Sequence, residues 1–300
     1  MSADDSDFYG EDDVVMELKS RVRNFDVQTW WDQHKYANMQ LKLQDHKQPH
    51  VALNTSRLHN PWAGVDYAWQ LTETVDAFLD RIPPATTEQT AQNAWIWICN
   101  PYSSRKTKGE ADNQLVRGGE DEAPEAEGAD LRTLIQAGEE RLHMASQFIN
   151  PCKSSGQTQA FINRECRKAG ADAAKDILGL ARELRVTCGK WMLFCSVANV
   201  NDTWEVVAKA TVNNELGIAA KVAPKSNVDN RLERLICVYT ADFSNTKDVK
   251  RVADKMKQLG LARGITLYYK PDIFTYLGIS SGNPWEMRAS IYDTKTIFKE

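Results

Sequence analysis

Several patterns common in enzymes, secreted proteins and membrane proteins are missing from this sequence. No apolar run approaches the roughly 18 residues that a membrane span needs. The 300 residues contain no P-loop, no Gly-x-Gly-x-x-Gly, no Cys-x-x-Cys pair and no Cys/His cluster at metal-ligand spacing. The N-terminus is acidic rather than basic and then apolar, so it is not a secretory signal. We therefore expect no membrane span, no cofactor and no metal.

The six cysteines lie mostly inside apolar segments, and no pair has the spacing of a redox or metal motif. Without a secretion signal they read as reduced, buried thiols. These features favour a cytoplasmic or nuclear protein.

Two other tempting motifs are weak. Gly278-Ile279-Ser280-Ser281-Gly282 matches the nucleophile elbow G-x-S-x-G, but Pro284 opposes the helix that must follow, and no His comes later in the chain. A turn is expected there. His46 and His50 have helical spacing for zinc, but Pro49 lies between them, so we expect loop histidines.

Acidic residues are concentrated in two segments. Residues 1–13 hold six acidic and no basic side chains, and residues 110–130 hold eight acidic side chains and Arg117. The whole chain has 37 basic and 41 acidic residues; without these segments 36 basic and 27 acidic remain, a net charge of +9. The two segments have too few apolar residues to offset their chain entropy, so we expect both to be disordered. The basic remainder suits an anionic partner.

These shifts in composition define the expected organisation. Residues 1–13 form a disordered acidic tail, and residues 14–54 form a peripheral, partly helical segment. Residues 55–300 form a single domain, interrupted by a disordered acidic loop at about 103–130. Within it, apolar spacing predicts helices over 72–81, 131–150 and 158–185 and a first strand over 93–98.

Residues 189–279 alternate regularly between strand and helix patterns. Strands are expected at 189–195, 218–222, 235–240 and 265–269. Between them, Asp202-x-x-Glu205 resembles a capping box that opens a helix ending near Gly217, and a second helix runs from 245 to 259 and ends at Gly260. The predicted fold class is α+β: a curved, mostly antiparallel sheet with the C-terminal helices on one face.

This order of elements resembles the second half of the mRNA cap-binding translation initiation factor fold. A closer resemblance is to an uncharacterised eukaryotic family, the basophilic-leukaemia-expressed proteins, and it implies the same fold. Five segments carry it: Asn60-Pro61-Trp62-Ala63-Gly64, Arg81-Ile82-Pro83-Pro84, Trp95-Ile96-Trp97, Gly189-Lys190-Trp191-Met192, and the run from Tyr269 to Gly278.

The resemblance to cap-binding factors extends only in part to the ligand site. Lys190 falls where those factors place a basic residue beside the phosphates, and Lys225 falls near another such position. Tyr239 replaces a Trp that lines their slot. The two Trp rings that hold the methylated base have no counterpart, since the loop after Asn100 offers only Tyr102 as an aromatic. The resemblance therefore implies no complete cap site.

The strand sequences also bear on this site. A strand with one solvated face alternates apolar and polar residues, but 95–99 and 191–195 are apolar throughout. We therefore expect extra material to cover part of the second sheet face and to bury Met192 and Phe194. The helices at 131–150 and 158–185 and the segment Trp62–Trp69 are the available material. Trp62 and Trp69 themselves are either packed there or form a stacking platform.

Three functions remain open. The first is a non-catalytic protein that binds RNA or a nucleotide through a basic, aromatic-lined face, with the candidate residues Tyr102, Lys190, Lys221, Lys225, Tyr239 and Lys270. The second is a protein-interaction module that uses the basic outer face of helix 245–259. The third is a phosphate-ester or nucleotide-processing enzyme that uses Lys190, Lys270 and Asp272. In it, Asp272 would be the general base. No base is paired with a nucleophile in the sequence.

Overall fold

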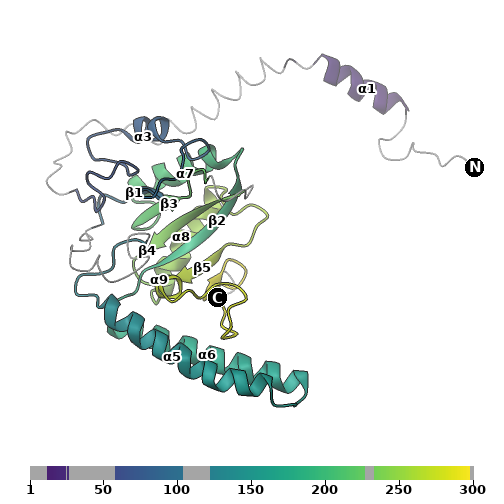
Figure 1. The fold of residues 1–300 in the computed structure, drawn as a ribbon. Coiled ribbons are helices and arrows are strands. Elements are labelled where there is room, and N and C mark those ends of the chain that lie inside the picture. The colour runs from purple at the N-terminus through teal and green to yellow at the C-terminus, as the bar shows by residue number, and fades with distance from the viewer. Residues whose placement is uncertain (1–11, 25, 27–57, 104–121, 227–232, 298–300) are drawn as a thin grey trace, which may run out of the picture. The chain divides into compact units, whose positions relative to one another are not determined.

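The computed structural model describes residues 12–24, 26, 58–103, 122–226 and 233–297 (Figure 1). Its contacts divide the chain into two units, Met1–Asn54 and Thr55–Glu300. In the first unit the described residues form one helix, α1 (Asp12–Arg23). The predicted acidic tail up to residue 11 and the His46/His50 pair lie outside the described residues.

The second unit is built on a six-stranded sheet with the order β1-β3-β4-β2-β5-β6. Every neighbouring pair of strands is antiparallel. The strands are β1 (Ile96–Cys99), β2 (Gly189–Ser196), β3 (Ala219–Val222), β4 (Glu233–Thr240), β5 (Tyr268–Pro271) and β6 (Tyr292–Asp293). With the helices described next, this arrangement confirms the predicted α+β class and antiparallel sheet.

One face of the sheet, here called the first face, packs against α7 (Val200–Val212) and α8 (Thr246–Gln258). Trp191 of β2 lies at the centre of this face and is fully buried. Its indole Nε1 donates a hydrogen bond to the carbonyl of Val249 in α8 at 3.1 Å, and its ring meets Tyr269 of β5 edge-on. The prediction that the C-terminal helices cover one face is confirmed.

Four further helices complete the unit: α3 (Val75–Arg81), α5 (Leu131–Lys153), α6 (Gln159–Glu183) and the short α9 (Asp272–Tyr276). The long helices α5 and α6 lie side by side, next to α9 (Figure 1). Their buried side chains belong to the same apolar cluster as the first face. These two helices therefore extend the first-face core and do not cover the second face.

The second face is covered in part, and by irregular chain rather than helices. The segment Trp62–Trp69 runs beside β1, where Trp97 N–H donates to the carbonyl of Tyr67 at 2.8 Å. Residues 122–125, which were predicted to belong to a disordered loop, are buried instead. The cover ends before Phe194, whose side chain is 48% exposed, while Met192 is half-buried. The expected burial of Phe194 is wrong, and part of this face is open.

The ends of α7 and α8 agree only in part with the predicted helix caps. The helix α7 begins after Asn199, and no side chain caps it, so the proposed capping box at Asp202 is not used. The chain leaves α7 through Asn214 (φ 58°) rather than Gly217. Gly217 serves close packing, since a Cβ there would lie 1.7 Å from the carbonyl oxygen of Tyr239. Gly260 (φ 79°) follows α8 as predicted.

The run 278–282 forms a turn after α9, with both glycines at positive φ. The expectation of a turn, rather than a nucleophile elbow, is confirmed.

Candidate functional site

Three neighbouring strands bring predicted site residues together on the second face. Lys190 of β2 lies opposite Tyr239 of β4 in register, and Lys221 lies on β3, the next strand. All three reach Glu122, from the irregular segment that covers this face. Lys190 Nζ and the Tyr239 hydroxyl both donate to its Oε2, and Lys221 Nζ lies 3.3 Å from its Oε1. A carboxylate of the protein thus occupies the space between the two cations.

A second carboxylate completes this arrangement. Asp272, the first residue of α9, accepts a hydrogen bond from Lys190 Nζ at 3.1 Å, and the hydroxyl of Thr275 accepts another at 3.0 Å. Glu122, Lys190, Lys221, Tyr239 and Asp272 are all buried, and we call them the buried charge cluster. Such a group of charges is stable only when each is paired, because desolvation of an isolated ion is costly.

The pKa values reflect this balance of burial and pairing. Burial lowers the pKa of Lys190, but Asp272 and Glu122 outweigh it and the net shift is upward. For Lys221 burial dominates, and its pKa is lowered despite Glu122. Burial would raise the pKa of Glu122, but Lys221 and Lys190 lower it. Burial raises the pKa of Asp272 to about 6, with Lys190 opposing it. Pairing therefore favours the charged forms of Glu122 and Lys190, whereas burial disfavours those of Asp272 and Lys221.

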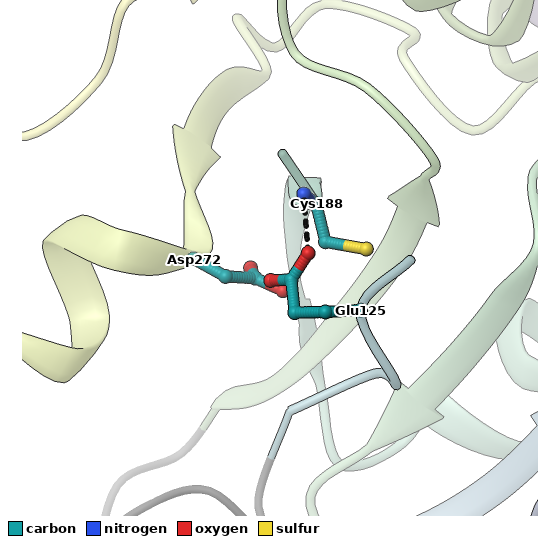
Figure 2. Close-up of side chains that lie close together, drawn as sticks. All are labelled: Glu125, Cys188 and Asp272. Atoms are coloured by element: carbon teal, nitrogen blue, oxygen red, sulfur yellow. Dashed lines mark hydrogen bonds between the residues drawn. The ribbon is translucent and has the colours of Figure 1, made fainter. Parts of the chain in front are cut away.

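Glu125 anchors the other end of the covering segment. Its Oε2 accepts hydrogen bonds from the backbone N–H groups of Thr187 and Cys188 at 3.0 and 3.1 Å. Ligand atoms of Glu125, Cys188 and Asp272 lie within 4.8 Å of one another. In Figure 2 the two carboxyl groups face each other, with the sulfur of Cys188 to one side.

Two carboxyl groups and a thiol could in principle bind zinc. Here Lys190 already supplies positive charge to Asp272. Burial is the main cause of the raised pKa of Asp272, and Lys190 is the cation that opposes it. We therefore assign no metal to this group.

The remaining predicted residues have separate positions. Lys270 of β5 lies opposite Lys190 in register and is half-buried, and burial, together with Lys190, lowers its pKa to about 8. Tyr102 is 56% exposed. Lys225 is exposed and forms an ion pair with Glu88 at 3.4 Å. Of the six predicted residues, three belong to the buried charge cluster and Lys270 lies beside it. The two lysines of the cluster are paired and buried rather than part of an open basic face.

Burial also bears on the enzyme alternative. Asp272 is fully buried, and its Oδ1 is bound to Lys190. A general base must come within hydrogen-bond reach of a substrate proton, and Asp272 is not presented to a substrate in this arrangement.

Sequence reasoning missed Glu122 and Glu125. Both lie in the acidic segment that predicted disorder, and neither has a periodic apolar pattern beside it. The available signal was indirect: two strands apolar on both faces required a cover, and two lysines on one of those faces required an anion.

The aromatic side chains on this face are packed rather than presented as a pair of stacking walls. The Trp62 ring stacks on Trp97 with centroids 4.4 Å apart and planes inclined by 19°. Trp97 in turn contacts Tyr239, with centroids 5.7 Å apart. Of the two interpretations of Trp62, the structure supports packing.

The uncovered part of the second face forms an open groove of about 780 Å³. Trp95, Phe194 and Leu235 provide its apolar wall, and Arg234 lies at its side. Pro224 and Ser226, which flank the exposed Lys225, also line it. We call this space the second-face groove. It combines an exposed aromatic ring with nearby cations, which is the composition of a surface that stacks nucleic-acid bases.

Taken together, fold and site define an α+β protein with an antiparallel sheet, helices on one face, and a partly filled, partly open second face. The model of the family described as basophilic leukemia-expressed protein Bles03 matches residues 18–278. The chain belongs to this family, as the sequence resemblance indicated.

Solved structures similar to this chain are eIF4E proteins. They include Ascaris suum eIF4E-3 with the m2,2,7G cap, at 12% identity over 37% of this chain and 60% of that one, with a TM-score of 0.29. C. elegans eIF4E-3 with the 4E-binding protein Mextli and a cap analog has 14% identity over 30% and 54%, with a TM-score of 0.26.

The match thus spans less than two thirds of either eIF4E protein. At these values the likeness carries no argument about ligand or partner. Within the described residues, no helix has both the length and the apolar character to span a membrane.

Proposed function

We propose that this protein is a non-catalytic binding protein that stacks a base of single-stranded RNA, or of a nucleotide, in the second-face groove. The observation that supports this most is the ring of Phe194, which is 48% exposed and lines the groove together with Trp95 and Leu235. An exposed aromatic ring in a groove offers a face on which a base can stack. Lys225 supplies charge for a phosphate, and an RNA ligand fits the cytoplasmic or nuclear location that we propose.

The proposed contacts lead to a specific binding experiment. A fluorescein-labelled oligouridylate titrated into the protein at low salt should show saturable anisotropy. Phe194→Ala should weaken binding by about 5- to 100-fold, since loss of a base–aromatic stack costs roughly 1–3 kcal/mol. Lys225→Gln should flatten the slope of log affinity against log salt by nearly one unit, as expected for one lost phosphate contact.

A matched control is available on the same sheet face. Tyr268 of β5 is also 48% exposed but does not line the groove. Tyr268→Ala should leave RNA affinity within about twofold of wild type, the range expected when no stack is lost. If Phe194→Ala and Tyr268→Ala have the same effect, or if the wild-type protein binds no RNA at low salt, the proposal is wrong.

The arrangement of the aromatic side chains predicts whether capped RNA is preferred over uncapped RNA. Trp62 already stacks on Trp97, and the groove offers aromatic side chains on one wall rather than two facing rings. A cation–π sandwich for a methylated base needs a ring on each side. We therefore expect capped and uncapped RNA of the same sequence to bind with similar affinity. A strong preference for the capped form would contradict this geometry.

A second candidate function is binding of an acidic segment of a protein by α8. Lys247, Lys250 and Lys255 line a hollow of about 420 Å³ on the outer side of this helix. Glu215 and Asp254 also line the hollow, and Lys255 is ion-paired with Glu215 at 3.0 Å. Lys247 and Lys250 are the cations of this face that suit an acidic peptide.

The two candidates separate in affinity purification after nuclease treatment. A stoichiometric partner that is lost with Lys247→Glu/Lys250→Glu but kept with Phe194→Ala supports the helical face. Loss of all bound material on nuclease treatment removes this candidate.

A further inference from the structure

A second groove lies between α6 and the chain around α8 and β6. Its volume is about 870 Å³. One wall is a stripe of α6 that includes Arg167, Lys175, Leu178 and Arg182, whose spacing places them on one side of a helix. The opposite wall is formed by some of the residues in the ranges 243–246 and 286–292. We call this space the α6 groove.

The floor of the α6 groove is apolar and rigid. Phe243 and Phe274 are buried below it, and Leu178 and Ile291 are half-buried at its sides. The hydroxyl of Tyr292 donates to the carbonyl of Phe243 at 3.0 Å, which fixes this ring in the wall. The floor can therefore contact an apolar or aromatic body.

The rim is strongly cationic. Arg167, Lys175, Arg182 and Arg288 surround the opening, and all four are exposed. The one acidic residue in the lining, Glu286, is already bound to Lys153 at 2.9 Å. Within the described part of the chain, Arg167, Lys175 and Arg182 form no ion pair. By contrast, Arg81, Arg141 and Arg251 each pair with a nearby carboxylate.

Four cations around one apolar opening repel one another and attract an anion. A phosphate monoester suits such a rim better than a single carboxylate, because it offers three acceptor oxygens and up to two negative charges to the surrounding donors. The hydroxyls of Thr246 and Ser290 also line the groove and can donate to the same oxygens. A volume near 870 Å³ lies in the range of small-molecule sites.

We propose that the α6 groove binds a phosphate monoester carried on an apolar or aromatic body. The phosphate lies at the rim between Lys175 and Arg182, which stand two turns apart on the same side of α6, and the body lies on the floor beside Phe243 and Leu178. Two sources have this chemistry: a nucleoside monophosphate, with its base as the body, and a single-chain lipid phosphate.

The test is calorimetric titration of the full chain with AMP and, separately, with monomeric dodecyl phosphate. We expect at least one to bind, and the one that binds identifies the source. Lys175→Gln and Arg182→Gln should each weaken binding about tenfold, which is about 1.4 kcal/mol. Lys168→Gln removes the same charge from another residue of α6, which does not line the groove, and should leave affinity unchanged.

Two further results bear on the assignment. Phe194→Ala alters the second-face groove only, so it should not change this binding. If it does and the Lys175 and Arg182 variants do not, the ligand lies in the second-face groove and the proposal is wrong. Absence of binding by either phosphate at low salt, or equal effects of Arg182→Gln and Lys168→Gln, also overturns it. Thermal melts of the variants show that each is folded.

Discussion

At the scale of single residues, Glu122 is buried and depends on several partners for its charge. It is a buried carboxylate that contacts Lys190, Lys221 and Tyr239. Removing one partner of a buried ion pair leaves the other charge desolvated, so the loss exceeds the net stabilisation of the pair itself.

Glu122→Gln should therefore destabilise the protein by about 3–5 kcal/mol, measured as a shift in the midpoint of urea unfolding. Adding Lys221→Met to this variant removes one of the cations left without Glu122 and should recover part of the lost unfolding free energy. A single variant within about 0.5 kcal/mol of wild type, as for an ordinary surface site, would mean that Glu122 is not held as described.

Asp272 predicts a pH dependence of the opposite sign to that of most carboxyl groups. Its pKa is raised from 3.8 to about 6 in the folded protein, so between these values the folded state binds more protons than the unfolded chain. The stability that this group contributes is fully present below its unfolded pKa and is lost as the pH rises through about 6.

The unfolding free energy of wild type minus that of Asp272→Asn should therefore fall by on the order of 1–3 kcal/mol as the pH is raised from roughly 4 to 7. Glu122 has a lowered pKa and acts in the other direction, but it is common to both proteins. A difference that is constant with pH would show that Asp272 is ionised in the folded state throughout this range.

The residues of the cluster were predictable to different degrees. Lys190, Lys221 and Tyr239 could be grouped from sequence, because strand alternation and order place them on one face of neighbouring strands. Glu122 could not, since its position depends on tertiary contacts of an irregular segment. A net charge of +9 outside the acidic segments suggested an open basic surface, yet two of those lysines are neutralised by a residue of the acidic segment itself.

At the scale of elements, α8 and β2 followed directly from sequence patterns, while α9 and β6 did not. α8 has an apolar stripe and a terminal glycine, signals that are local to the element. α9 has five residues and β6 two, too few for any periodicity to appear. Their formation depends on neighbours: the N–H of Asp272 donates to the carbonyl of Cys188, and β6 pairs with β5.

The packing of α6 gives a matched pair of substitutions. A Cβ at Gly170 would lie 2.3 Å from the carbonyl oxygen of Trp285, whereas a Cβ at Gly179 of the same helix meets nothing within 4 Å. Alanine in a helix interior is favoured over glycine by roughly 0.5–1 kcal/mol, so Gly179→Ala should stabilise the protein. Gly170→Ala must displace backbone and should destabilise it by about 1–3 kcal/mol.

Thermal unfolding of the two variants compares them directly. Equal shifts of the same sign would contradict the close contact of α6 with the chain at Trp285, and with it the wall of the α6 groove that this chain forms.

At the scale of the whole molecule, the second unit contains the buried charge cluster, the second-face groove and the α6 groove. Its first face is closed by helices, its second face is closed in part by residues 62–69 and 122–125, and its grooves lie on the remaining surface. This distribution explains why the strand sequences correctly predicted a cover on the second face but wrongly extended it over Phe194. A strand that is apolar on both faces indicates burial on both, yet exposed aromatic side chains at a binding surface produce the same pattern.

The division of the chain into Met1–Asn54 and Thr55–Glu300 makes a prediction about folding. Each compact unit holds its own contacts, and a domain with its own core folds alone. A fragment of residues 55–300 should therefore unfold cooperatively at a temperature within about 2 °C of the full chain, well below the shift of roughly 2–4 °C that each lost kcal/mol produces at this size. It should also keep the RNA and phosphate affinities of the full chain, because Phe194, Lys175 and Arg182 all lie within it. A fragment that melts many degrees lower, or that binds only when residues 1–54 are present, would show that the first unit contributes to the fold or to the sites.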